Sequence, residues 1–208
     1  MKNHPTFNKI LPISDEAFII LIEEMRHFLQ LNAGFIRKLK TVLYEVNYKK
    51  DHKLLINKER QEIVWFLIDG VVKETNVDTQ SDKKTTVWFW FAKSFIYVTP
   101  GFFDREPSQS IVTAGCNCRV IFISYEDWKA LKDTFDTTDT VTEKIRGAYN
   151  VLRREHASNI STLSITERYI KYKDKLNLLF PHFSLKDIAE YMGMSADRLS
   201  GLRKTPGL

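Results

Sequence analysis

Residues 183–204, FSLKDIAEYMGMSADRLSGLRK, have the pattern of two short helices joined by a tight turn. Ser184 and Ser195 are suitable N-caps, because a serine hydroxyl accepts hydrogen bonds from free N–H groups in a first helical turn. Gly193 suits the left-handed backbone that ends a helix. The inward positions are Leu185, Ile188, Ala189, Met192, Leu199 and Leu202, with Met194 in the angle between the helices. This order indicates a helix-turn-helix, with an ordinary helical hairpin as the alternative.

The second of these helices carries the side chains that would face base edges in a DNA major groove. Arg198 can pair with guanine through two hydrogen bonds, and Asp197 can accept from a cytosine amino group or simply serve its own helix N-terminus. Basic residues later on the helix suit phosphates. The predicted DNA-binding residues are Ser184, Lys186, Ser195, Ala196, Asp197, Arg198, Ser200, Arg203 and Lys204. The sequence stops at KTPGL, which leaves no room for the β-hairpin wing that often follows, so we expect a minimal DNA contact.

The positive charge of the chain is confined to the same end. Residues 144–208 carry 12 Lys/Arg and 6 Asp/Glu, whereas residues 1–143 have a net charge of −1. A basic end of this kind is expected if only that end meets a polyanion. A basic surface that serves solubility alone is the other interpretation.

The chain before this end changes from helix patterns to strand patterns and back. Apolar spacing predicts a helix over residues 14–28, capped by Ser14, and a short one near residues 33–40. From about Thr41 to Ser124 the runs are short, rich in β-branched and aromatic residues, and separated by turns such as Asp69-Gly70. Such strands predict an all-β barrel or sandwich. Helical patterns return over residues 125–135 and 166–180.

Between the last two of these segments lies a long helical pattern with a narrow apolar row. Its members, at steps of four, three and four residues, are Val141, Ile145, Ala148 and Leu152. A narrow row suits the pairing of one helix with another, so it predicts a homodimer seam, with packing inside one chain as the alternative.

Composition excludes several classes of protein. The two cysteines, Cys116 and Cys118, stand one residue apart, so a disulfide-stapled secreted scaffold is not expected. No run reaches the roughly 18 apolar residues of a membrane span, and no signal peptide is evident, so the expected location is the cytoplasm. The five histidines are scattered, and no catalytic set, phosphate loop or metal cluster is recognisable. We therefore expect no enzyme, no metal and no cofactor.

The order of β-domain, long helix and helix-turn-helix resembles the Crp/Fnr family of bacterial transcription regulators. The segments that carry the resemblance are IVWFLIDGVVKE (63–74), SIVTAGCNCRVIFISYEDWKAL (110–131) and IAEYMGMSADRLSGLRK (188–204). The segment with Leu163, Ser164, Glu167, Arg168 and Tyr169 is similar to the Bacteroidetes-type subset. The resemblance implies an α+β protein with a jelly-roll, cyclic-nucleotide-binding-like β-barrel, a parallel dimer through the long helix, and a two-fold DNA operator. RNA polymerase is a further candidate partner.

Departures from the family pattern bear on the ligand. Members that bind cyclic AMP have a Gly-Glu pair and an Arg-Ser or Arg-Thr pair, but here Ser108 and Gln109 stand at the latter positions. We therefore expect no cyclic-AMP binding. Two cysteines are too few for the four-cysteine iron–sulfur cluster of the oxygen-sensing branch. Many aromatic residues of the β-domain are core, and some are candidates for a pocket. The predicted pocket residues for an unknown small effector are Phe95, Tyr97, Ser108, Gln109 and Ser110.

The sequence thus predicts three parts: a sensor β-domain with its N-terminal helices (1–135), a dimerisation helix (136–162) and a helix-turn-helix domain without a full wing (163–208). The expected function is sequence-specific, homodimeric DNA-binding regulation of transcription. The alternative is a small-ligand-binding or interaction module whose DNA binding has decayed, for which Gly201 on the second helix is one motive, because many relatives have a basic residue there.

Overall fold

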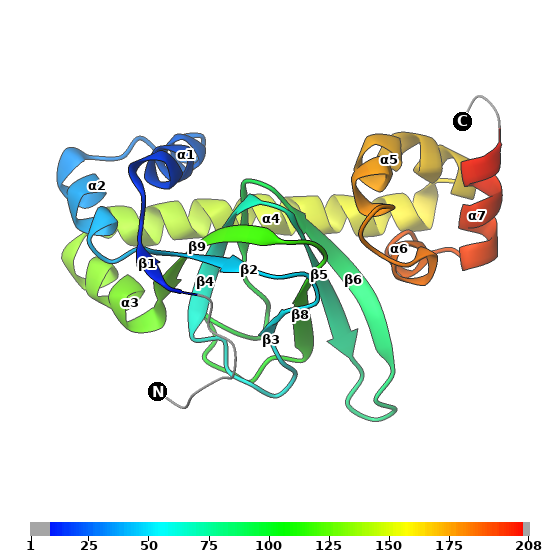
Figure 1. Cartoon of the computed structure of the whole chain (residues 1–208), viewed down its shortest axis with the longest axis horizontal. Helices are drawn as coiled ribbons and strands as arrows, with labels where there is room; N and C mark the ends of the chain where they lie inside the picture. The colour runs from blue at the N-terminus through cyan, green and yellow to red at the C-terminus, as the bar shows by residue number, and fades with distance from the viewer. Residues whose placement is uncertain (1–8, 206–208) are drawn as a thin grey trace.

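The computed structural model describes residues 9–205 of the chain, and one long helix organises it. Helix α4 (Asp136–Thr162) runs along the molecule in Figure 1, with helices α1–α3 toward one end and α5–α7 at the other. The strands lie between these two groups of helices. Expectations about a leader or a wing fall partly on residues 1–8 and 206–208, which lie outside the described residues.

The N-terminal helices begin and end where the apolar spacing predicts. Helix α1 (Asp15–Arg26) is capped by the Ser14 hydroxyl, which accepts a hydrogen bond from the Ala17 N–H at 3.3 Å. Helix α2 (Ala33–Lys40) follows with Asn32 as its cap. Both helices turn their apolar sides to the strands and α3, so they belong to the same core as the β-domain.

The predicted β-domain is a sandwich of two sheets. One sheet has five strands in the order β1-β2-β9-β4-β7, and the other has four in the order β3-β8-β5-β6. The strand bounds are β1 Leu11–Pro12, β2 Tyr44–Tyr48, β3 Lys53–Leu55, β4 Ile63–Asp69, β5 Val71–Val77, β6 Lys84–Phe91, β7 Ser94–Ile96, β8 Ser110–Ala114 and β9 Cys118–Ser124. All strand pairings within the two sheets are antiparallel. Consecutive neighbours such as β5 and β6 form a hairpin, and non-consecutive neighbours such as β4 and β9 are joined by longer crossovers.

The turn at Asp69-Gly70 passes the chain from one sheet to the other. Gly70 has φ +109°, a conformation that side chains of L-residues rarely adopt. A Cβ atom at this position would also lie 2.6 Å from the Cys118 sulfur. Gly70 is therefore required both by the backbone and by the close packing of Cys118, whose thiol is buried and unpaired with another cysteine.

Helix α3 (Tyr125–Thr134) follows the last strand and precedes α4. After α4 come three helices, α5 (Ile165–Leu179), α6 (Leu185–Tyr191) and α7 (Ala196–Lys204). Ser164 and Glu167 form a reciprocal capping box at the start of α5. On α5, Tyr172 is buried, whereas Ile170 is 54% exposed. Within residues 9–205, no helix is long and apolar enough to cross a membrane.

Candidate nucleic-acid interface and effector pocket

Helices α6 and α7 meet at a turn that is fixed by hydrogen bonds and packing. Ser184 and Ser195 cap the two helices, accepting from the N–H groups of Asp187 (3.1 Å) and Arg198 (3.3 Å). Gly193 has φ +61°, and a Cβ there would lie 2.8 Å from Ile160 on α4. The turn glycine therefore provides both the left-handed backbone and the close approach to α4.

Arg168 connects this turn to the rest of the C-terminal unit, which is the group of helices α5–α7. The residue is only 6% exposed, and its Nη1 donates to the carbonyl oxygens of Ile160 (3.1 Å) and Met192 (3.0 Å). These carbonyls lie near the end of α4 and at the end of α6. One guanidinium thus fixes the relative positions of α4, α5 and α6.

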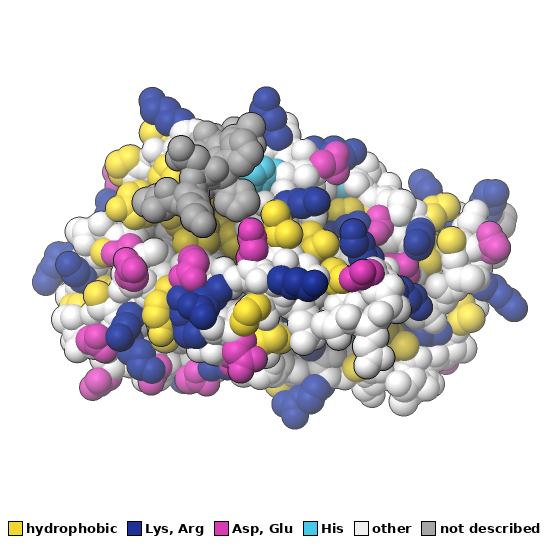
Figure 2. Space-filling view, turned by 90° about the horizontal axis from the view of Figure 1, so that it is seen from below, with side chains coloured by type: hydrophobic (Ala, Val, Ile, Leu, Met, Phe, Trp, Pro, Cys, Tyr) yellow, Lys and Arg dark blue, Asp and Glu magenta, His cyan; other side chains and the backbone are white. Residues whose placement is uncertain are grey.

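The residues predicted to touch DNA lie at the outer side of this unit. Ser184, Lys186, Ser195, Asp197, Arg198, Arg203 and Lys204 are exposed, while Ala196 and Ser200 are half-buried. Leu199 is fully buried, so the inner face of α7 is packed against the unit. The Arg203 guanidinium lies 4.4 Å from the centre of the Phe180 ring, which directs it along α5. Dark blue basic side chains project from this end of the molecule in Figure 2.

Helix α6 is docked on strand β6 of the sandwich. The Lys73 ammonium lies 2.6 Å from the Asp187 carboxylate, and the Thr86 N–H donates to the Glu190 carboxylate at 2.7 Å. Aromatic rings add to this contact, with Phe89 packed against Phe183 (centroids 4.8 Å apart) and Tyr191 (5.1 Å). The sequence gives no signal for these contacts, because their partners lie about a hundred residues apart in the chain.

The Asp187 carboxyl is ionised in this contact between α6 and the sandwich. Burial on its own raises the pKa of the Asp187 carboxyl, but hydrogen bonds from Lys73 and Ser184 outweigh it and hold the pKa below its usual value. The carboxylate is therefore charged at neutral pH and remains paired with Lys73.

His156 of α4 occupies the joint between the sandwich and the C-terminal unit. Its ring stacks on Tyr191 with centroids 4.1 Å apart, and its nitrogens contact the Tyr172 hydroxyl (3.0 Å) and the Tyr191 carbonyl (2.9 Å). Burial lowers the pKa of His156 to about 4, with nearby cationic side chains acting in the same direction. The imidazole is therefore neutral at physiological pH.

The predicted effector residues fall into two separate places. Ser108 and Ser110 are buried in the sandwich, where the Ser110 hydroxyl donates to Glu74 at 3.1 Å, and Gln109 is exposed. Arg153 from α4 pairs with the same Glu74 carboxylate at 2.6 Å. This ion pair anchors α4 to the sandwich. Ser108, Gln109 and Ser110 do not line the pocket that contains Phe95 and Tyr97.

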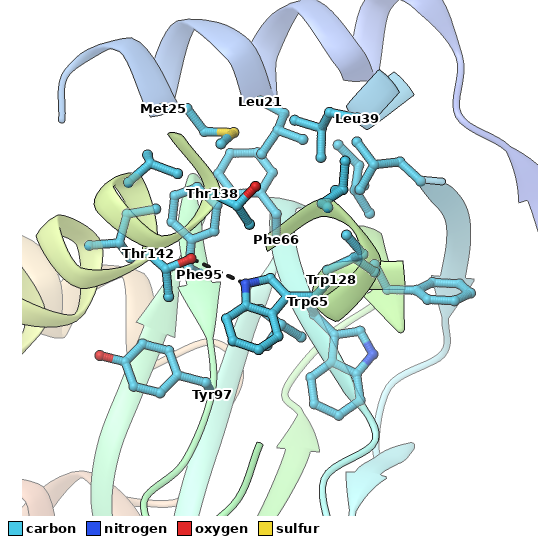
Figure 3. Close-up of a pocket in the computed structure, with 18 of the residues that line it drawn as sticks. Leu21, Met25, Leu39, Trp65, Phe66, Phe95, Tyr97, Trp128, Thr138 and Thr142 are labelled. Atoms are coloured by element: carbon cyan, nitrogen blue, oxygen red, sulfur yellow. Dashed lines mark hydrogen bonds between the residues drawn. The ribbon is translucent and has the colours of Figure 1, made fainter. Parts of the chain in front are cut away.

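Phe95 and Tyr97 line a cavity of about 90 Å³ between helices α1–α4 and the five-stranded sheet. Figure 3 shows the side chains that converge on it, including Leu21 and Met25 from α1, Phe66 from β4 and Thr138 from α4. The walls are almost wholly apolar. The Trp128 indole N–H donates to the Thr142 hydroxyl at 3.2 Å, as the dashed line in Figure 3 indicates.

The row that predicts a dimer seam on α4 is divided. Val141 and Ile145 are 3% and 7% exposed within the single chain and line the cavity, so these two residues are packed inside the chain. The physical reason is that α4 lies against α3 and the sandwich along its first turns, and an apolar row is buried by either kind of neighbour. Ala148 is half-buried and Leu152 is 44% exposed.

Comparisons with solved structures place this architecture among known folds. The chain is similar to FixK2 from Bradyrhizobium japonicum, with 14% identity, a TM-score of 0.65 and coverage of 78% of this chain and 83% of that one. For a protein from Eubacterium rectale described as a transcriptional regulator of the Crp/Fnr family, these values are 11%, 0.66, 83% and 82%. For the regulator CLP from Xanthomonas campestris they are 16%, 0.61, 83% and 90%.

Comparison of the sequence with family models and with curated proteins finds no match. The resemblance to Crp/Fnr regulators that the sequence suggests is therefore confirmed at the level of the fold: the chain combines a cyclic-nucleotide-binding-like β-sandwich with helices that match those of Crp/Fnr regulators.

Proposed function

We propose that the protein is a homodimeric, sequence-specific DNA-binding regulator of transcription, in which α6 and α7 form a helix-turn-helix and α7 is the recognition helix. The observation that carries the proposal is the division of α7 into two faces. Leu199 is fully buried, whereas Asp197, Arg198 and Lys204 are exposed on a helix capped by Ser195. A helix fixed on one side and polar at its N-terminal half on the other is what major-groove recognition requires. Structural neighbours that are regulatory proteins rather than enzymes support the same role.

The roles of the individual residues follow from their positions. Arg198, in the first turn of α7, is assigned to a guanine edge, and Asp197 to a cytosine amino group. Arg203 and Lys204, in the last turn, are assigned to phosphates. The backbone N–H groups at the start of α7 are a further phosphate contact. Three-part domain organisation, with breaks near residues 135 and 162, belongs to the same proposal.

The dimer is assigned to the exposed middle of α4. Val151 is 55% exposed and Leu152 is 44% exposed, and a Cβ at Gly147 would meet no atom of the described part of the chain within 4 Å. Glycine one turn before two exposed apolar residues permits a close approach of a second helix. The proposed seam is therefore Gly147, Ala148, Val151 and Leu152, shifted toward the C-terminal half of the row that the sequence indicates.

The dimer is tested by Val151→Glu combined with Leu152→Glu. Two buried like charges at a symmetric seam repel, so the variant is expected to sediment as a monomer while wild type sediments as a dimer. The matched control is Thr140→Glu, an exposed position about three turns earlier on the same helix. Wild type that sediments as a monomer at micromolar concentration would contradict the dimer.

DNA recognition is tested by selection from a random duplex pool at graded salt. Wild type is expected to enrich a two-fold-symmetric sequence, and Arg198→Ala to lose about 1–3 kcal/mol of discrimination at one base pair per half-site. Lys129→Ala on α3 removes one exposed positive charge far from α7 and is the matched control. Enrichment of no sequence at any salt would remove the proposal and leave the ligand-binding module as the better interpretation.

A further inference from the structure

The geometry points to a binding site in the cavity between α1–α4 and the five-stranded sheet: we propose that it takes one small, uncharged aromatic molecule that carries a single hydrogen-bonding group, of the phenol class. The name "effector" for this ligand rests on the proposed function, but its binding does not. The cavity and α7 lie on different parts of the chain, so each can be tested alone.

The walls of the cavity select an apolar, ring-shaped ligand. Aromatic side chains surround it from strands and helices alike, namely Phe35, Trp65, Phe66, Phe95, Tyr97 and Trp128. Ring edges and faces favour another ring at offset or edge-to-face contact. Aliphatic side chains such as Leu21, Leu39 and Val141 complete the lining.

One polar atom inside this apolar lining lacks a partner. The hydroxyl of Thr138 belongs to a residue that is 3% exposed, and it makes no hydrogen bond to any residue from 9 to 205. On the same helix, the hydroxyl of Thr140 donates to the Asp136 carbonyl, and that of Thr142 accepts from Trp128. A buried hydroxyl without a partner is costly, and a ligand oxygen at the cavity would relieve that cost.

The size of the cavity limits the ligand to one ring. Its volume of about 90 Å³ is smaller than the roughly 150 Å³ engineered apolar cavity that holds benzene. A six-membered ring therefore requires a small outward shift of a wall. Met25 is the adaptable part, because its unbranched thioether side chain has three rotatable bonds.

The charges near the cavity disfavour an ionised ligand. The one guanidinium in the lining, that of Arg146, is paired with Glu143 at 2.6 Å and lies 4.7 Å from the centre of the Phe103 ring. A carboxylate in the cavity would lose its hydration without gaining a free cation, and this is unfavourable. The ligand is therefore neutral, and the Thr138 hydroxyl supplies a polar contact for it.

The site is tested by titrating the full chain with phenol and with toluene, two probes of the same shape that differ by the hydroxyl group. Tryptophan fluorescence reports binding because Trp65 and Trp128 line the cavity. Wild type is expected to saturate with both probes. Thr138→Val, which removes the hydroxyl at constant shape, is expected to weaken phenol binding about fivefold and to leave toluene binding unchanged. Thr140→Val is the matched control and is expected to change neither.

A second variant keeps the test decisive. Val141→Phe fills the cavity and is expected to abolish saturation by both probes, with its fold checked by circular dichroism. Failure of wild type to saturate with either probe up to its solubility limit overturns the proposal. An equal change of phenol and toluene binding in Thr138→Val also overturns it. Neither outcome depends on DNA, so the result is separate from the fate of the regulator proposal.

Discussion

Helices α6 and α7 are adjacent, similarly capped and part of one compact unit, yet their surroundings are opposite. Helix α6 is held against the sandwich by Asp187, Glu190 and Tyr191, which contact Lys73, Thr86 and the aromatic side chains of β6. Helix α7 buries Leu199 and leaves its charged side chains in solvent. The docked face of α6 therefore determines where the unit lies, and the open face of α7 is free to bind a partner.

This contrast separates the effects that substitutions are expected to have. Changes at the docked face remove buried contacts and should lower the free energy of unfolding or release the C-terminal unit. Changes on the open face remove no buried contact, so they should not lower the free energy of unfolding, and loss of a charged side chain there should alter binding.

Acid is expected to cause the largest loss of unfolding free energy, through His156, whose ring stacks on Tyr191 of α6. The pKa of His156 is about 4 in the folded chain against 6.5 as the ordinary value, so the unfolded state binds the proton first. Stability from the neutral imidazole is complete above pH 6.5 and is lost as pH falls toward 4, by at most about 3 kcal/mol. Urea unfolding measured between these pH values checks the loss.

The control for this effect is His156→Gln, which does not titrate and should flatten stability over the same interval. The lowered pKa of Asp187 places the loss of its contribution below 3.8, its ordinary value, so this carboxylate does not produce the same curve. An unchanged slope in His156→Gln would show that the acid effect arises elsewhere.

A glycine at the docked face should be the next most sensitive position. A Cβ at Gly115 would lie 2.1 Å from the Phe183 ring, so Gly115→Val should push that ring off Phe89. We expect a loss of about 2 kcal/mol in unfolding free energy and faster proteolysis between α5 and α6. In a Phe183→Ala background the same substitution should cost much less, because the clash is absent.

Gly201, on the open face of α7, is the glycine to compare with Gly115. No atom of the described residues lies within 4 Å of a Cβ at Gly201 on α7, so Gly201→Ala should raise stability by about 0.5–1 kcal/mol through helix propensity. A destabilising effect of Gly201→Ala comparable to that of Gly115→Val would show that α7 is not open.

The elements of the fold are largely predictable from this sequence, because local signals mark them. Serine caps at Ser14, Ser184 and Ser195 and the turn at Gly70 stand where the chain uses them. The burial of α5 follows the helical period. Its buried apolar residues are Tyr169, Tyr172, Leu176 and Leu179, at steps of three, four and three, and the exposed Ile170 lies beside that row.

Contacts between distant segments were not predictable. The pairs Lys73–Asp187 and Arg153–Glu74 depend on how α4 and α6 lie on the sandwich, and no local pattern encodes that. The apolar row of α4 did not say whether Val141 and Ile145 face the same chain or a second one. Thr138 gave no signal, since a threonine in a helix usually has a partner for its hydroxyl, and its isolation follows only from the packing.

The ion pair at the docked face should have a smaller effect than the glycine. The Lys73 and Asp187 side chains are 20% and 24% exposed, so solvent screens part of their attraction. Lys73→Met should lower the free energy of unfolding by about 1 kcal/mol. The exposed pair of Lys40 and Asp15 is the control, and Lys40→Met should change stability less than Lys73→Met does. Equal losses in the two variants would show that docking adds nothing to the Lys73 pair.

The smallest change in stability is expected at Lys204, on the open face. Lys204→Ala should leave the unfolding free energy within about 0.5 kcal/mol of wild type, because the side chain is exposed and has no buried partner in the described part of the chain. Its effect should appear in DNA binding, where loss of one phosphate contact per half-site lowers the slope of log K against log salt by about 0.9 for each site. Titrations of the selected duplex at four salt concentrations measure this slope. An unchanged slope would assign the phosphate contact to another residue, and a marked loss of stability would mean that α7 is held as α6 is.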